Sequence, residues 1–151
     1  MKRAQRLKMV QNVVEDQERR RAEQLARTEK RVNECETRLT ELESYQANYA
    51  REFAARASHG IGAAGLRDYQ AFLARLSDAV RQQSQTVFRV RAERDAELRI
   101  WQSAAQRAEA LGRIVKRWQD EEQRTYERHE QRESDERAQR ISNGGLHARA
   151  P

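Results

Sequence analysis

The placement of glycine and proline constrains this chain more than any other feature. Its single proline is Pro151, and three of its six glycines fall within the stretch SHGIGAAG at residues 58 to 65. No comparable interruption follows until Asn143-Gly144-Gly145. Because little else can break a helix, we predict a helix over about 5–57, a loop at about 58–65, a second helix over about 66–141 and a disordered tail at 142–151.

Apolar residues recur along both predicted helices at alternating steps of four and three. In the first helix nine of fourteen such positions are apolar: Leu7, Gln11, Val14, Glu18, Arg21, Leu25, Thr28, Val32, Cys35, Leu39, Leu42, Gln46, Tyr49 and Phe53. In the second helix thirteen of sixteen are apolar: Leu66, Tyr69, Leu73, Leu76, Val80, Gln83, Val87, Val90, Arg94, Glu97, Trp101, Ala104, Ala108, Leu111, Val115 and Trp118. We call these two series the seam. Such a repeat across a short loop predicts an all-α fold, a long two-helix antiparallel coiled-coil hairpin.

The position of the loop also predicts which residues face each other. A loop centred within residues 58–65 places residues opposite when their numbers sum to about 123. The second seam series ends at Trp118, opposite about residue 5, where the first helix begins. Residues 119–141 therefore have no partner helix and are predicted to be an unpaired charged overhang. This overhang is either a solvated or frayed helix or a segment that docks a partner.

Charge and cysteine content limit the function and location. The formal net charge is +6, but the 30 Lys and Arg residues are interleaved with 24 Asp and Glu residues. This mixture favours solvated helix faces over a groove that binds nucleic acid. A lone cysteine, Cys35, gives no sign of an oxidising compartment. No stretch matches a signal peptide or a membrane span, so a cytoplasmic location is expected.

No pattern in the chain indicates catalysis, a metal or a cofactor. A two-helix hairpin offers no pocket that excludes water from reacting groups. His59, His129 and His147 fall in the loop, the overhang and the tail, without an HExxH or CxxC arrangement. The glycine-rich loop lacks the Lys and Ser or Thr of a phosphate-binding loop. We therefore expect a protein that is not an enzyme and that holds no cofactor.

Two groups of side chains are candidate binding surfaces. Basic residues gather at the open end of the hairpin, where they could meet an acidic partner: Lys2, Arg3, Arg6, Lys8, Lys116 and Arg117. Apolar residues on and beside the seam gather near the loop, at the same level on both helices: Leu42, Tyr45, Tyr49, Phe72, Leu76 and Ala79. This second group is either a protein-binding patch or a locally wider core.

The stretches YQANYAREF at 45–53 and DYQAFLARL at 68–76, on either side of HGIGAAG, resemble the FliJ family of flagellar export proteins. The resemblance spans residues 7 to 118. It implies a non-enzymatic, rod-like stalk of the type III export apparatus that is peripheral to the inner membrane through its partners only. The implied partners are the hexameric export ATPase FliI, the export gate protein FlhA and export chaperones, with no nucleic acid.

The resemblance also assigns the two surfaces. The gate contact of the family corresponds to Leu42, Tyr45, Tyr49, Phe72, Leu76 and Ala79, and we expect the basic end to meet the ATPase. At two positions on the edge of the gate contact, Arg38 and Gln83, this chain differs from the polar residues of the family. These two positions are therefore not assigned to the gate contact. The alternatives are the stalk of a virulence type III secretion system, a basic coiled coil that binds nucleic acid, and a self-assembling structural rod.

Overall fold

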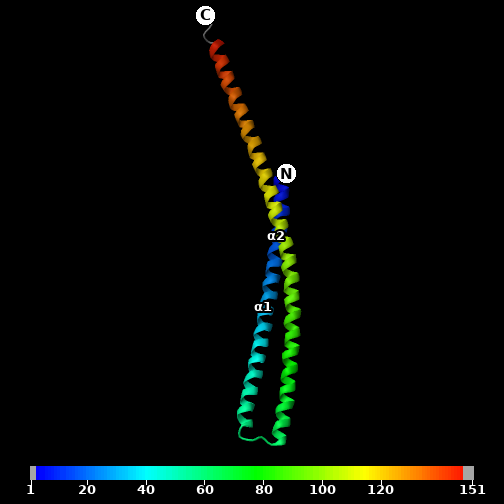
Figure 1. Ribbon diagram of the computed structural model, residues 1–151. Coiled ribbons are helices and arrows are strands. Elements are labelled where there is room, and N and C mark those ends of the chain that lie inside the picture. The colour runs from blue at the N-terminus through cyan, green and yellow to red at the C-terminus, as the bar shows by residue number, and fades with distance from the viewer. Residues whose placement is uncertain (1–2, 148–151) are drawn as a thin grey trace. The chain divides into compact units, whose positions relative to one another are not determined.

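The computed structural model describes residues 3–147, with side chains up to residue 145, and contains two helices joined by a loop (Figure 1). Helix α1 spans Arg3–Ala57 and helix α2 spans Ala63–His147. The helices pack against each other, which confirms the predicted all-α two-helix hairpin.

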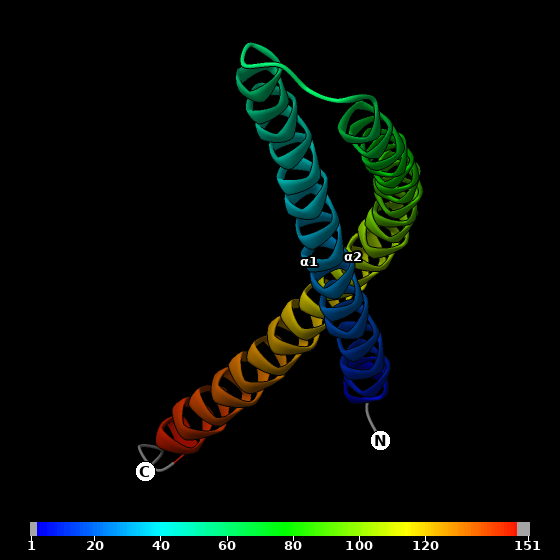
Figure 2. The same ribbon diagram turned by 90° about the horizontal axis from the view of Figure 1, so that it is seen from below.

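A short loop at residues 58–62 reverses the chain (Figure 2). The amide of Gly60 donates to the carbonyl oxygen of Ala57 at 3.1 Å, and Gly60 adopts a φ of +90°, a left-handed conformation that favours glycine. Helix α2 begins at Ala63, three residues before the predicted start. Gly65 therefore lies in the first turn of α2, where a Cβ atom would come within 2.9 Å of the Ile61 side chain. This glycine lets the loop pack closely against the helix start.

The chain divides into two compact units, which we describe separately. The loop unit is Gln17–Ala104, and the terminal unit is Met1–Asp16 together with Ala105–Pro151. The core of the loop unit consists of seam residues from both helices: Val32, Leu76, Val87 and Val90. In the terminal unit the buried apolar residues are Ala4 and Val115. Each unit is thus held together by one line of side chains between two helices.

The seam of the loop unit follows the predicted register. The amide nitrogen of Gln46 donates to the Ser77 hydroxyl at 3.1 Å, and these residue numbers sum to 123. Trp101 donates from its ring N–H to Glu18 at 2.8 Å, a pair whose numbers sum to 119. Among the loop unit's seam positions only Arg21 and Leu66 are exposed. The spacing of the sequence therefore predicted the facing residues to within about one helical turn.

The terminal unit has the same register and explains a glycine within α2. Gly112 lies beside Gln11, and their residue numbers sum to 123. A Cβ atom at Gly112 would be 3.4 Å from the Gln11 side-chain nitrogen. Gln11 is 9% exposed and occupies a seam position. The missing side chain at Gly112 thus leaves room for a glutamine within the seam.

The overhang begins later and ends later than predicted. Glu122 still packs against α1, whereas every side chain from Gln123 to Gly145 is exposed. Helix α2 then continues to His147, which corrects the predicted disordered tail for residues 142–147; residues 148–151 lie outside the described residues. Glycine lowers helix propensity by about 1 kcal/mol without forbidding the helix, so Gly144 and Gly145 do not end α2.

Adjacent residues of α2 test the seam directly. Val87 is 2% exposed and its neighbour Phe88 is 79% exposed. We expect Val87→Asp to lower the free energy of unfolding by about 3 kcal/mol or more, because it loses packing and buries a charge. Phe88→Asp should change it by less than about 1 kcal/mol. Urea denaturation followed by far-UV circular dichroism measures both, and equal losses would contradict this seam.

Candidate protein-binding surfaces

Five aromatic rings form a continuous cluster between the helices near the loop. Tyr45 meets Phe72 edge-on at a centroid distance of 6.1 Å, and Phe72 meets Tyr49 at 4.4 Å. Tyr49 stacks on Tyr69 at 5.3 Å, and Tyr69 stacks on Phe53 at 3.5 Å. We call these five residues the aromatic cluster. Its rings alternate between α1 and α2 and therefore join the two helices.

The cluster belongs partly to the core and partly to the surface. Tyr49, Phe53 and Tyr69 occupy seam positions, whereas Tyr45 and Phe72 each precede a seam position by one residue. Tyr45 is 52% exposed, and the other four rings are half-buried. A residue one position off the seam points toward the flank of a coiled coil, which explains why Tyr45 reaches the surface.

The six residues predicted for the gate contact differ in their access to a partner. Leu76 is 7% exposed and belongs to the core. Leu42, Tyr49, Phe72 and Ala79 are half-buried, so Tyr45 presents the largest exposed fraction of the six. The sequence prediction had left Phe53 and Tyr69 out of this group. Phe53 and Tyr69 are aromatic seam residues on either side of the loop, and this position could have predicted that they belong with the group.

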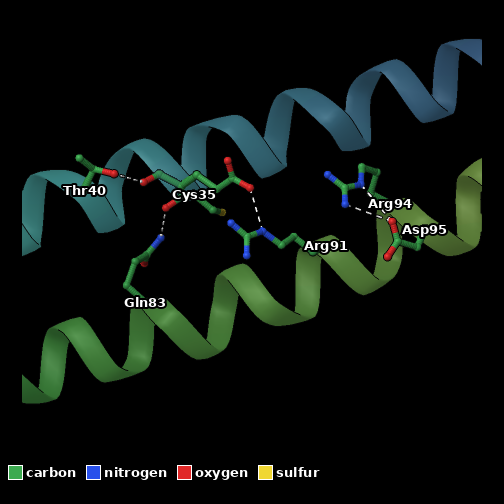
Figure 3. Close-up of polar contacts among 7 residues, drawn as sticks. Cys35, Thr40, Gln83, Arg91, Arg94 and Asp95 are labelled. Carbon is green, nitrogen blue, oxygen red and sulfur yellow. Dashed lines mark hydrogen bonds and ion pairs between the residues drawn. The ribbon is translucent and has the colours of Figure 1, made fainter.

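Gln83, one of the two positions that depart from the family pattern, has a structural contact. Figure 3 shows its side chain reaching from α2 to α1, where the amide nitrogen donates to the carbonyl oxygen of Cys35 at 2.9 Å. Nearby, Arg91 donates to the Glu36 carboxylate at 2.8 Å. Gln83 is half-buried, whereas Arg38 is exposed. Of these two positions, only Arg38 is freely accessible at the edge of the predicted gate contact.

The basic residues predicted for the ATPase contact lie in the terminal unit. Lys2 is outside the described residues, and the guanidinium of Arg3 lies 3.8 Å from the centre of the Trp118 ring. The remaining four are exposed: Arg6, Lys8, Lys116 and Arg117. On α2 they are followed within a turn by Asp120 and Glu121. The basic surface is therefore bordered by carboxylates.

The described residues contain no group of three His, Cys, Asp or Glu side chains that could hold a metal ion. His59 is exposed in the loop, and His129 lies 3.2 Å from Glu133 on the same helix. The side chain of His147 lies outside the described part of the chain. Within the described residues, no helix is both long and apolar enough to cross a membrane.

A protein-family model for the flagellar FliJ protein matches residues 1–146. The chain belongs to the FliJ family. No curated protein and no solved structure matches it. Membership of the FliJ family supports a role related to flagellar type III export. The FliJ match extends beyond the stretch from 7 to 118 that carries the resemblance in sequence, and it includes most of the overhang.

The aromatic cluster predicts a difference between two tyrosines of α1. Tyr49→Ala should lower the free energy of unfolding by about 2 kcal/mol or more, because Tyr49 contacts both Tyr69 and Phe72. Tyr45→Ala should cost less than about 1 kcal/mol, because Tyr45 is half-exposed and has one edge-on ring contact. Thermal and urea unfolding measure both variants. A Tyr45 variant as unstable as the Tyr49 variant would identify the whole cluster as core.

Proposed function

We propose that this chain is a non-enzymatic stalk protein of the flagellar export apparatus that links the export ATPase FliI to the export gate protein FlhA. The observation that carries the proposal is the exposed ring of Tyr45, held on the flank of an aromatic cluster in a chain of the FliJ family. In this proposal the protein works in the cytoplasm and reaches the inner membrane only through its partners.

The geometry of Tyr45 suits a protein contact. Its ring is supported by Phe72, which in turn packs on Tyr49, so the exposed surface rests on ordered neighbours. A rigid aromatic side chain buries a large area at a low cost in conformational entropy. The gate protein would cover Tyr45 and the accessible edges of Phe72, Leu42 and Ala79. Tyr49 and Leu76 would support this surface from below.

The terminal unit supplies the proposed ATPase contact. Arg6, Lys8, Lys116 and Arg117 are exposed and could meet an acidic surface of the ATPase. Charges of this kind mainly raise the rate of association and select the partner. Export chaperones are included among the proposed partners, although no surface is assigned to them.

Ion pairing argues against a nucleic-acid function. In the loop unit Arg31 pairs with Glu93, Arg91 with Glu36 at 2.8 Å, and Arg94 with Asp95 at 3.1 Å. Arginines that already contact carboxylates are less available to neutralise phosphates.

The family description favours the flagellar stalk over its counterpart in a virulence secretion system. We therefore propose protein partners only.

Gate binding tests the first half of the proposal. Tyr45→Ala should weaken binding of the soluble part of the gate protein by at least roughly tenfold, or about 1.4 kcal/mol. Phe88→Ala is the matched control, because Phe88 is a 79% exposed aromatic residue of the same unit outside the proposed surface. Calorimetric titration measures both, with circular dichroism to verify folding. Unchanged binding after Tyr45→Ala, or an equal loss after Phe88→Ala, would refute this gate surface.

Charge reversal tests the second half. The double change Arg6→Glu with Lys8→Glu should reduce binding or stimulation of the export ATPase, and more strongly at low salt because exposed charges are screened by ions. Arg67→Glu with Arg75→Glu makes the same change in charge at exposed positions of the loop unit and should have little effect. If the two variants behave alike, the basic residues of the terminal unit are not the ATPase contact.

A further inference from the structure

The spacing of the α2 seam extends beyond Trp118 in polar residues. Glu122, Thr125 and His129 follow Trp118 at the same steps of four and three. Of these three, Glu122 still contacts α1. Trp118 and these three side chains, together with Arg3, Glu121 and Tyr126, line an open groove of about 640 Å³ within the terminal unit. The groove begins where α1 begins, so it is the direct continuation of the α1–α2 interface.

The contacts at the near end of the groove show which chemistry it accepts. The Arg3 guanidinium lies 3.8 Å from the centre of the Trp118 ring, a cation–π contact. The backbone N–H of Ala4 donates to the Glu122 carboxylate at 3.5 Å, at the first turn of α1. The near end is therefore occupied by an arginine and a helix amide, and both are donors with positive character.

The far end of the groove also presents an aromatic ring and a carboxylate, Tyr126 and Glu121. Among the described residues, neither makes a contact with α1 like those of Trp118 and Glu122. Tyr126 is 57% exposed, and its hydroxyl donates to Glu130 at 2.8 Å. This hydrogen bond, together with the negative charges of Glu130 and Glu133, raises the pKa of Tyr126 above its usual value of 10.0. The exposed face of the Tyr126 ring can receive a cation. Glu121 lies on the same groove with its side chain exposed.

We propose that this groove is a docking site for an arginine-bearing amphipathic helix of another protein. We expect a helix as the partner, because α2 residues at steps of four and three already pack on a helix, α1, in the rest of the hairpin. Arginine suits the site because it can stack on Tyr126 while pairing with Glu121 or Glu130. The proposal does not rest on the gate or ATPase contacts; of the residues predicted for those contacts, Arg3 alone lines this groove.

A second copy of this chain is a poorer occupant. Residues 119–141 carry eight Asp and Glu residues against five Lys and Arg residues. Two overhangs side by side would therefore bring like charges together. The basic start of α1 in a second copy is already packed on its own α2 through Arg3 and Ala4. A basic helix from a different protein complements the charge without this conflict.

The test uses the full chain and a synthetic helical peptide with Leu and Ala at seam positions and Arg on its flanks. A second peptide carries Glu in place of every Arg. The chain has two tryptophans, Trp101 in the loop unit and Trp118 in the groove. With 5-fluorotryptophan incorporated, ¹⁹F NMR follows both during a titration. We expect the arginine peptide to shift the Trp118 signal while the Trp101 signal stays unchanged, and the glutamate peptide to shift neither.

Variants separate the groove from general charge attraction. Tyr126→Ala, and separately Glu121→Gln with Glu130→Gln, should weaken binding of the arginine peptide by at least roughly tenfold. Asp135→Asn with Glu136→Gln removes the same charge from exposed positions of the overhang outside the groove and should change the affinity by less than about twofold.

Four results would overturn the proposal: no binding of the arginine peptide, equal shifts of both tryptophans, equal binding of the glutamate peptide, or equal weakening by the two charge variants. Sedimentation of the chain alone decides the remaining alternative. A dimer that Tyr126→Ala converts to a monomer would identify a second copy as the occupant and would also overturn the proposal.

Discussion

Burial of a single stripe of side chains between α1 and α2 is the constraint on which the rest of the structure depends. In the loop unit this stripe contains Val32, Leu76, Val87 and Val90, and almost everything off it stays in contact with water. Two helices can enclose a line of residues but not a water-free pocket. The chemistry available to such a chain is therefore that of exposed surfaces, and its functional residues are to be sought on the flanks of the seam.

Polar residues within the seam fix how the two helices align. Gln83 donates to the Cys35 carbonyl oxygen, and Trp101 donates to Glu18, so sliding one helix would break both bonds. By contrast, Gln11 and Glu97 each bury one side-chain oxygen without a hydrogen-bond partner in the described part of the chain. Such groups cost stability, whereas paired ones select one register over its neighbours. The alignment of the helices therefore depends on the paired groups, Gln83 and Trp101.

The two units present opposite chemistry to other proteins. The loop unit offers a supported aromatic ring at Tyr45, where binding would depend on the burial of apolar surface. The terminal unit offers exposed cations beside a groove lined by Glu121 and Glu122, where binding would depend on charge. The two proposed contacts would let a chain of the FliJ family distinguish its partners by the kind of surface that each brings. Salt would affect contacts with the terminal unit more than contacts at Tyr45.

The sequence by itself determined the two helices, their reversal near Gly60 and the seam positions of Val32 and Val87, because spacing and loop position are local properties of the chain. Only the tertiary structure decided which members of an apolar group reach the surface. Tyr45 and Phe72 each stand one residue before a seam position, yet Tyr45 is 52% exposed, whereas Phe72 is half-buried against Tyr45 and Tyr49. Likewise, the stacking of Arg3 on Trp118 joins residues far apart in the chain, and the groove that continues from it exists only once the hairpin has closed.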